Sequence, residues 1–196
     1  MKKIALLAAS AALFAFPAAA NAQAFVQIEG GLDVAQQGGE SEAGIQYGVS
    51  AGYDYDLSNG MFIGVQGSYG DSSARECAHD MFEANDRLCL EARRDLAAVV
   101  RLGTQIGARN KLYVLGGYTN TRVGLSYKGE TADALLDAIG GFSDAGAHET
   151  LNGFRLGAGY EYDVTSNLFI KAEYRYSNYG SDFSRHQGVL AVGTKF

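Results

Sequence analysis

The chain has 196 residues, a formal net charge of −6 and 19% charged residues. This length suits one domain, and the acidic balance argues against general nucleic-acid binding, which needs a basic surface. The chain contains one proline and 26 glycines. A near absence of proline is what a continuous hydrogen-bonded ladder of strands requires.

The first residues have the composition of a cleavable signal peptide. Two lysines precede an apolar run that ends at Pro17, and Ala20-Asn21-Ala22 supplies the small residues of a cleavage site. The apolar run is too short for a membrane anchor, and Gln23 is not the cysteine of a lipid-modified terminus. We therefore predict a signal peptide over 1–22 and one domain over 23–196. Cleavage would leave 174 residues and, because the leader carries two lysines and no acid, would change the net charge from −6 to −8.

Apolar and polar residues alternate with a period of two along the rest of the chain, which predicts strands. The polar parity carries Arg, Lys and Glu, as in the run GFRLGAGYEY at 153–162. No run after residue 22 reaches the ~20 apolar residues of a membrane-spanning helix, so insertion in a membrane would require a closed barrel. The predicted strands cover 24–34, 43–56, 61–70, 92–107, 112–128, 151–163, 168–177 and 187–196.

The predicted connections alternate between short and long. The short ones lie at 57–60, 108–111 and 164–167, and the first contains the tight-turn pair Asn59-Gly60. The longer ones lie at 35–42, 71–91, 129–150 and 178–186. Outer-membrane barrels have short periplasmic turns and longer external loops. The sequence therefore predicts an all-β fold, an eight-stranded antiparallel up-and-down transmembrane β-barrel.

Aromatic residues on the apolar parity are expected at both membrane interfaces. The predicted periplasmic girdle contains Tyr55, Tyr113, Tyr162 and Phe196, and the predicted outer girdle contains Tyr69, Tyr127 and Tyr176. The alternative is that tyrosine is common in strands of every kind. The same parity places Thr119 and Thr121 on the lipid-facing side.

Three segments and the last residue resemble one family. The segments GYTNTRV (117–123), GFRLGAGYEY (153–162) and KAEYRYSNY (171–179), with Phe196, are similar to small Gram-negative outer-membrane β-barrel proteins. These include opacity-type and porin-family surface proteins and the OmpA-like transmembrane barrel. The resemblance implies location in the cell outer membrane, a terminal Phe196 read by the outer-membrane assembly machinery, and periplasmic chaperones during biogenesis.

The inward parity predicts a charged lumen. An eight-stranded barrel has an interior just wide enough for side chains, so enclosed charges must pair or keep water. A structural salt-bridge core is favoured over a proton or ion path. The predicted network contains Glu29, Asp33, Asp54, Arg101, Arg122, Arg155, Glu161, Lys171, Glu173, Arg175 and Lys195.

Apolar residues open the upward strands on the same inward parity, and they predict a hydrophobic plug at the periplasmic end of the lumen. The four residues are Phe25, Phe62, Leu112 and Phe169. The alternative is a register slip in the strand over 112–128, where Leu112 and Val114 blur the alternation. A large, steady single-channel conductance would contradict the plug.

Cys77 and Cys89 are the two cysteines, and both lie in the second long connection. Because an exported chain meets an oxidising compartment, we predict a disulfide between them. Metal binding with His79 is the alternative, but this spacing matches zinc sites poorly. Two other features of the long connections are Arg94, which could meet lipopolysaccharide phosphates, and the segment 131–142, whose apolar spacing fits a short helix.

Catalytic groupings are scarce. The histidines His79, His148 and His186 all fall in predicted connections, and Ser184 with His186 is the one nucleophile and base close in sequence. We therefore expect no enzyme, no cofactor and no metal.

The leading interpretation is an integral outer-membrane barrel with a structural and surface-display role, whose loops mediate adhesion or recognition. Its partners would be outer-membrane lipid and lipopolysaccharide, with an extracellular ligand still unknown. The alternatives are a narrow porin-like channel and a lipid-modifying outer-membrane enzyme. A soluble periplasmic ligand-binding barrel would reverse the two faces, and the connection lengths, girdles and Phe196 argue against it.

Overall fold

A computed structural model describes residues 22–37, 39–57, 59–73, 75–79, 87–128, 147–180 and 183–196. The predicted signal peptide, apart from Ala22, and the segment 131–142 lie outside these ranges. No helix in the described ranges is long and apolar enough to cross a membrane. The described strands are β1 (Ala22–Gln37), β2 (Glu40–Asp56), β3 (Met61–Ser72), β4 (Arg75–His79), β5 (Arg87–Ile106), β6 (Asn110–Lys128), β7 (Ala147–Asp163), β8 (Leu168–Asn178) and β9 (Phe183–Lys195).

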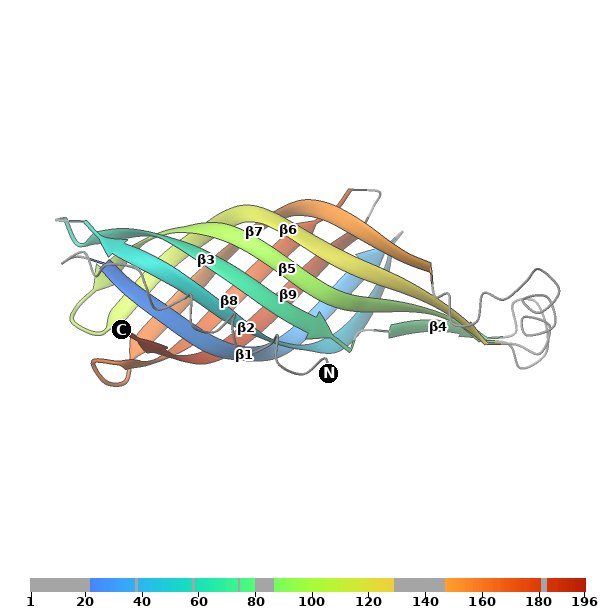
Figure 1. Ribbon diagram of the computed structural model, residues 1–196, viewed down its shortest axis with the longest axis horizontal. Helices are drawn as coiled ribbons and strands as arrows, with labels where there is room; N and C mark the ends of the chain where they lie inside the picture. The colour runs from blue at the N-terminus through green and yellow to red at the C-terminus, as the bar shows by residue number, and fades with distance from the viewer. Residues whose placement is uncertain are drawn as a thin grey trace, which may run out of the picture.

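Eight of the described strands close into a ring. Each pairs antiparallel with its neighbours, β1 closes the ring by pairing with both β2 and β9, and β3 pairs directly with β5. The short strand β4 pairs with β5 outside the ring (Figure 1). The predicted eight-stranded antiparallel barrel is therefore confirmed.

The strands are strongly staggered around the barrel. A path that starts at Phe25 and follows paired residues through all eight strands returns to β1 at Ala35, ten residues further along. Such a shear requires strands tilted by roughly 40° from the barrel axis. The tilt brings residues far apart in sequence to the same level of the lumen.

Two of the predicted long connections are wrong. The ladder between β1 and β2 continues to the pair Gln37 and Glu40, which leaves only positions 38–39 between the strands instead of 35–42. The connection between β8 and β9 is 179–182 instead of 178–186. Polar residues in these segments hydrogen-bond across the hairpins as strands, so their polarity did not mark the strand ends. The long connections are those that follow β3 and β6.

The predicted short turn at Asn59-Gly60 has the expected geometry. Gly60 has a φ of +79°, which favours glycine, and the Asn59 side chain accepts a hydrogen bond from the Met61 N–H at 3.1 Å. The other two short turns join β5 to β6 and β7 to β8 at the same end of the barrel, where Phe196 also lies (Figure 1).

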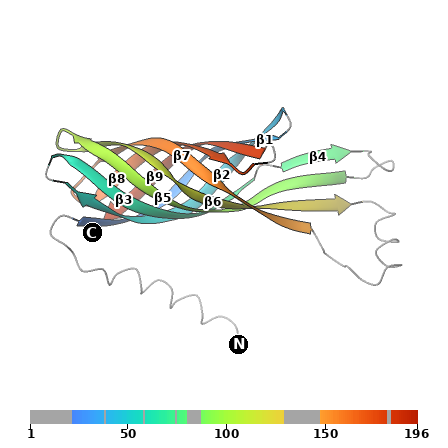
Figure 2. The same cartoon turned by 90° about the horizontal axis from the view of Figure 1, so that it is seen from above.

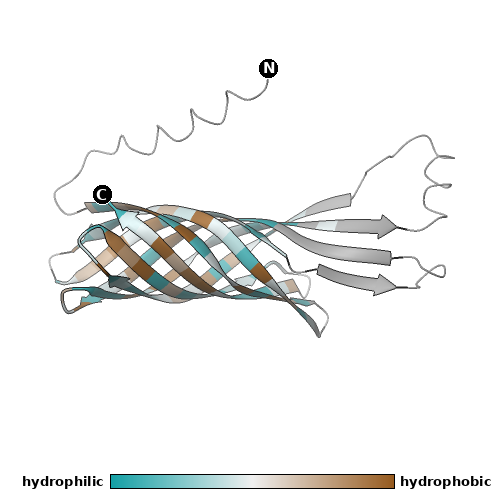
Figure 3. Ribbon diagram, turned by 90° about the horizontal axis from the view of Figure 1, so that it is seen from below, coloured by the Kyte–Doolittle hydropathy of each residue, from teal (hydrophilic) through white to brown (hydrophobic). Residues whose placement is uncertain are grey.

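Burial alternates along each barrel strand. In β8 and β9 every second residue is enclosed in the lumen, and the residues between face outward. The outward side carries large apolar residues such as Ile28, Val65 and Leu190. Figure 3 shows hydrophobic and hydrophilic blocks in alternation along the strands. A sheet with apolar residues outside and charged residues inside suits a barrel surrounded by lipid.

The predicted orientation of β6 is wrong by one residue. Leu112 is 48% exposed and faces outward, whereas Tyr113 is 2% exposed and faces the lumen. Thr119 and Thr121 are fully buried inside, so Arg122 lies on the outward parity and is not part of the lumen network. The physical reason is space, because a Cβ on Gly159 of β7 would lie 2.3 Å from the Tyr113 ring. Glycine at 159 makes room for an inward ring at 113.

Candidate functional site

The lumen is the most highly organised part of the described protein. At the end with the short turns, which the sequence predicts to face the periplasm and which we call the periplasmic end, the lumen is closed by aromatic rings that belong to four strands. Phe25, Phe62 and Phe169 are at most 3% exposed, and Tyr113 takes the place predicted for Leu112. The Phe25 and Phe169 rings meet edge to face at 6.0 Å between centroids, and Phe62 and Tyr113 do so at 6.3 Å.

Cations lie directly on this aromatic layer. The Arg101 guanidinium is 4.8 Å from the centroid of Phe25 and 4.2 Å from that of Tyr113. The Lys195 ammonium is 5.3 Å from the centroid of Phe169. Cation–π contacts of this kind are strongest where water is excluded. The aromatic layer is thus joined to the charged network instead of standing apart from it as a purely hydrophobic plug.

The same cations pair with carboxylates at this end of the lumen. Arg101 lies 3.3 Å from Asp54 and 3.2 Å from Glu161. Lys195 lies 2.8 Å from Glu161 and also contacts Asp163. Buried charges are costly unless they are paired, so these ion pairs account for the presence of the side chains inside the barrel, although Arg101 Nη1 and Asp54 Oδ1 form no hydrogen bond within the described residues.

The middle of the lumen is organised around Arg175. Its guanidinium donates two parallel hydrogen bonds to Glu29, at 2.7 and 2.8 Å, and it also contacts Glu173. Glu173 accepts a hydrogen bond from the Tyr113 hydroxyl at 2.6 Å and lies 3.5 Å from the Lys171 ammonium. Bidentate arginine–carboxylate pairs combine strength with a fixed geometry.

The outer part of the lumen contains a third cluster, centred on Asp95. The Arg155 guanidinium binds this carboxylate at 2.5 Å, and Arg185 lies 3.9 Å from it while also contacting Asp33. Thr119 donates a hydrogen bond to Asp95 at 3.1 Å. The lumen is therefore filled from its periplasmic end to its outer end.

Asp95, Lys111 and Arg185 belong to the lumen but are absent from the predicted network. Asp95 and Arg185 have the inward parity of their strands. The predicted strand over 187–196 began after Arg185, whereas Asp95 lies within the predicted strand over 92–107, on the parity of Arg101, and was not included in the network. Lys111 was lost with the register of β6. If the alternation had been followed two residues before the predicted start at 187, it would have identified Arg185 as an inward residue.

Most charges in the lumen are paired. Among the described residues the lumen cations are Arg101, Lys111, Arg155, Lys171, Arg175, Arg185 and Lys195, and the acids on the inward parity are Glu29, Asp33, Asp54, Asp56, Asp95, Glu161, Asp163 and Glu173. Every one of these acids except Asp56, which lies opposite Phe62, forms an ion pair with at least one of the cations. This arrangement is that of a structural core.

The one nucleophile and base pair suggested by the sequence does not form a catalytic geometry. Ser184 and His186 lie on the outward parity of β9, away from the lumen. The Nδ1 atom of His186 is 2.6 Å from the Tyr174 hydroxyl, and its ring lies 5.0 Å from that of Tyr176. His186 is thus part of an outward aromatic cluster. No cluster of potential metal ligands occurs among the described residues.

The predicted disulfide lies on β4 and β5. The backbone register places Cys77 directly opposite Cys89. Opposed residues of an antiparallel pair have Cα atoms about 4.5–5.5 Å apart, within the range that a disulfide spans.

Phe196 faces outward at the end of the barrel that has the short turns, and its N–H donates to the Ala24 carbonyl at 2.9 Å.

Four strands continue beyond the barrel at the end with the long connections. The β3–β5 ladder ends at Gly70 and Asp95, yet β5 continues to pair with β4 and β6, and β6 continues to pair with β7. Figures 1 and 2 show these strand ends extending past the rim. We call this extension the outer sheet, formed by 75–79, 87–92, 123–128 and 147–149.

Comparison with known proteins gives a consistent result. The model of the family described as "Outer membrane protein beta-barrel domain" matches residues 5–196. The 31 kDa outer-membrane immunogenic proteins of Brucella melitensis and Brucella suis are 30% identical to this chain over 158 residues, covering 79% of this chain and 59% of each relative. The chain therefore spans less than two thirds of the length of these relatives.

Two solved structures share the fold. Ail, the attachment invasion locus protein of Yersinia pestis, crystallised with the heparin analogue sucrose octasulfate, has a TM-score of 0.60 at 16% identity, over 90% of this chain and 99% of Ail. Neisserial surface protein A has a TM-score of 0.58 at 19% identity, over 88% of this chain and 97% of that protein. At these identities the likeness concerns architecture.

Proposed function

The chain belongs to the outer-membrane β-barrel domain family of the Gram-negative outer membrane, and from this premise we propose that it is a non-enzymatic barrel whose outer sheet and adjoining connections recognise ligands at the cell surface. The outer sheet is the observation that carries the proposal. A barrel that only filled the membrane would need no strands beyond its rim, whereas binding surfaces are commonly built on elements that a rigid scaffold projects into solvent.

The rigid scaffold is the filled lumen. Its ion pairs connect all eight barrel strands except β3, which contributes Phe62 and Gln66 to the same interior. Strands held in this way provide a fixed base for β5, β6 and β7 where they leave the membrane. The filled lumen also argues against the narrow-channel alternative.

A disulfide between Cys77 and Cys89 would tie the edge strand β4 to β5. We propose this bond because the two residues are opposed in the ladder and an exported chain meets an oxidising compartment. Intact-mass measurement after alkylation, with and without prior reduction, is the test. We expect alkylation at both cysteines only after reduction, and labelling of the unreduced protein would contradict the bond.

Removal of the outer sheet tests recognition. In one variant, two-residue Asn-Gly turns replace 75–91 and 124–148, which cuts the hairpins back to the barrel rim. In the matched control, positions 38–39 of the first outer turn are replaced by Asn-Gly. Bacteria that display each protein are measured for attachment to epithelial monolayers and to immobilised heparin, the second because Ail was crystallised with a heparin analogue.

We expect cells with the intact protein and the control to attach, and cells with the trimmed barrel to lose attachment to at least one of the two surfaces. Heat-modifiable gel mobility verifies that every variant is folded. Attachment by the trimmed barrel equal to that of the intact protein would overturn the proposal, as would attachment by the intact protein no greater than that of cells without it.

Planar-bilayer recording tests the filled lumen. We expect the purified intact protein to show no steady conductance, because aromatic rings and ion pairs occupy the interior. A large, steady conductance would instead support the channel alternative.

A further inference from the structure

Arginines gather at a β-bulge on the outer rim. The β5–β6 ladder pairs Ala92 with Val123, and its next pair is Asp95 with Thr121. Positions 93 and 94 on β5 therefore oppose a single residue on β6, Arg122. Both bulged positions are arginines, so the backbone register sets Arg122 opposite positions 93 and 94. Bulges often redirect side chains at functional sites.

Two of these arginines face the membrane side of the barrel. Asp95 and Thr121 point into the lumen, with exposures of 6% and 0%, so Arg94 and Arg122 lie on the opposite, outward parity. The Arg94 Nη2 atom donates a hydrogen bond to the Asn120 side chain at 3.2 Å. Arg94 therefore belongs to an outward surface instead of the lumen network.

A row of polar groups continues from Arg94 across β6 and β7. The Asn120 amide donates to the Asn152 oxygen at 2.6 Å, and the Tyr118 hydroxyl donates to that same oxygen at 2.6 Å. On each strand these polar residues lie closer to the outer rim than the outward apolar residues, such as Leu156 on β7. This is the level at which lipid headgroups meet an outer-membrane barrel.

The two outward arginines have unused hydrogen-bonding capacity. Neither forms an ion pair with a carboxylate in the part of the chain that the structure describes, and the Nε atoms of both lack a hydrogen-bond partner. Asp71 on the neighbouring strand β3 accepts a hydrogen bond from the Ser72 N–H at 2.8 Å. Two arginines that the bulge places opposite each other, and that form no ion pair with a described carboxylate, favour an anion with several oxygens, because guanidinium donors match phosphate geometry.

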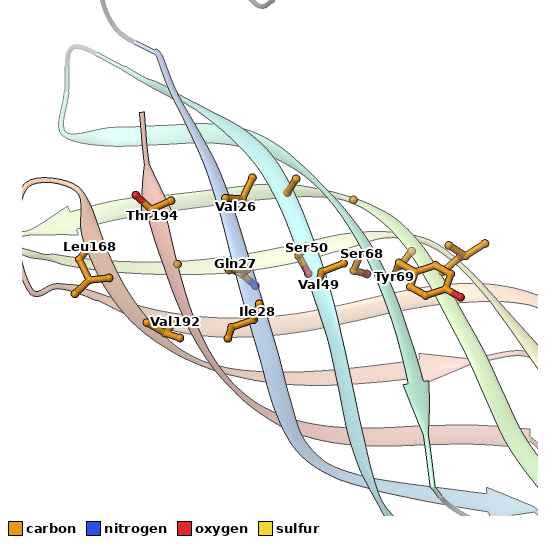
Figure 4. Close-up of a pocket in the computed structure, with 15 residues that line it drawn as sticks. Val26, Gln27, Ile28, Val49, Ser50, Ser68, Tyr69, Leu168, Val192 and Thr194 are labelled. Carbon is orange, nitrogen blue, oxygen red and sulfur yellow. The ribbon is translucent and has the colours of Figure 1, made fainter. Parts of the chain in front are cut away.

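An apolar groove of about 800 Å³ begins beside this site. It crosses the outward face from Leu168 and Val192, over Val26 and Ile28, to Tyr69 and Leu96 (Figure 4). Its floor is low because Ala51 and Gly67 are small, and a Cβ on Gly67 would meet no atom within 4 Å. Leu96 is two residues from Arg94 on the outward face of β5, on the membrane side of the rim. The groove and the arginines therefore form one continuous surface.

We propose that this surface binds lipopolysaccharide, with a phosphate held by Arg94 and Arg122 and one acyl chain lying in the groove. A phosphorylated glycolipid fits this surface because the site combines cationic donors, amide groups suited to sugar hydroxyls and an apolar groove. The inference rests on the outer-membrane location of the chain, and it does not depend on ligand recognition by the outer sheet.

Binding is measured with the purified full-length protein folded in phosphatidylcholine nanodiscs. Three probes are added in separate arms: lipopolysaccharide, lipopolysaccharide dephosphorylated by phosphatase, and phosphatidylglycerol. The variants are Arg94→Gln/Arg122→Gln, which removes the cations, and Gly67→Leu, which fills the groove. Arg109→Gln, at an exposed turn of the periplasmic end, is the matched control.

We expect intact lipopolysaccharide to bind the native protein and the control, and to bind the double arginine variant roughly tenfold more weakly, as the loss of charge-assisted hydrogen bonds implies. Dephosphorylated lipopolysaccharide and phosphatidylglycerol should bind the native protein more weakly than the intact glycolipid. Gly67→Leu should also weaken lipopolysaccharide binding, because the new side chain occupies the groove. Heat-modifiable gel mobility verifies that this variant is folded.

Equal affinity of the native protein and the double arginine variant for lipopolysaccharide would overturn the phosphate site. Equal affinity for phosphatidylglycerol and lipopolysaccharide would overturn the glycolipid assignment. Self-association of the native protein that Gly67→Leu abolishes, without any change in lipopolysaccharide binding, would assign the groove to a second copy of the chain. The nanodisc assay contains no epithelial or heparin surface. A negative result in it therefore does not bear on the proposal that the outer sheet recognises cell-surface ligands.

Discussion

The arginines inside the barrel and those on its outer rim differ in what surrounds them. Arg175 is enclosed and contacts two carboxylates, whereas Arg94 is partly exposed and hydrogen-bonds a neutral asparagine. A buried charge must be neutralised within the fold, because its desolvation is otherwise too costly. A rim charge has no such requirement and stays available for a ligand. The contrast separates charges that hold the barrel together from charges that can bind.

The largest expected effect comes from breaking the middle of the lumen network. In Arg175→Ala, Glu29 and Glu173 lose their shared cation while they remain enclosed. We expect the free energy of unfolding to fall by about 3–5 kcal/mol, as when one partner of a buried ion pair is removed. Urea titration in lipid vesicles, followed by gel mobility, measures the change.

A matched double variant sharpens this result. Glu29→Gln/Arg175→Met removes one charge from each side of the bidentate contact, and Glu173 keeps the Lys171 ammonium at 3.5 Å. We expect this variant to recover most of the lost stability, because no buried charge is left without a partner. A loss of stability as large as that of Arg175→Ala would show that size and packing at 175, and not charge, hold the middle of the lumen.

A somewhat smaller effect is expected at the aromatic layer. Phe62 is fully buried, and Phe62→Ala would remove its contacts with Tyr113, Arg101 and Lys111. We expect a loss of about 3 kcal/mol, the lower end for a phenylalanine cavity, since the site is near the lumen entrance and can admit water. The outward Ile63→Ala is the control, and equal losses would place both residues in comparable surroundings.

The sequence predicts the fold and much of the lumen because alternation is unambiguous in most strands. Arg155, Glu173 and Arg175 stand on a parity with no competing apolar run, so their inward orientation follows directly from the period of two. In β6 both parities carry apolar residues, and the choice between Leu112 and Tyr113 depends on Gly159, a residue of the next strand. Sequence pattern within one strand contains no such information.

The partners in the lumen and the arginine bulge could not be predicted for a related reason. Arg175 meets Glu29 across 146 positions of the chain only because the strands are staggered by ten residues around the barrel. Arg94 lies opposite Arg122 only because β5 has one extra residue at the bulge. Shear and bulges are properties of the closed sheet, and a single strand does not display them.

A test of the β6 register follows from Tyr113 and gives an intermediate effect. Tyr113→Phe removes the hydroxyl that binds Glu173 at 2.6 Å, and we expect a loss of about 1–2 kcal/mol in unfolding free energy. Tyr160→Phe removes an outward hydroxyl that binds Asn110 at 2.5 Å, and it should cost less because the site is exposed. The reverse order of the two losses in urea titration would argue for an outward Tyr113.

The smallest expected effect is that of the rim arginines on stability, and it tests the contrast most directly. Arg94→Gln leaves no carboxylate unpaired in the described structure, so its unfolding free energy in phosphatidylcholine vesicles should stay within about 0.5 kcal/mol of the native value. With lipopolysaccharide added, the native protein should gain more stability than the variant, because a ligand that binds only the folded state stabilises it. A large loss for Arg94→Gln without lipopolysaccharide would mean that the rim arginine supports the fold as the lumen arginines do, and the distinction between the two sets would fail.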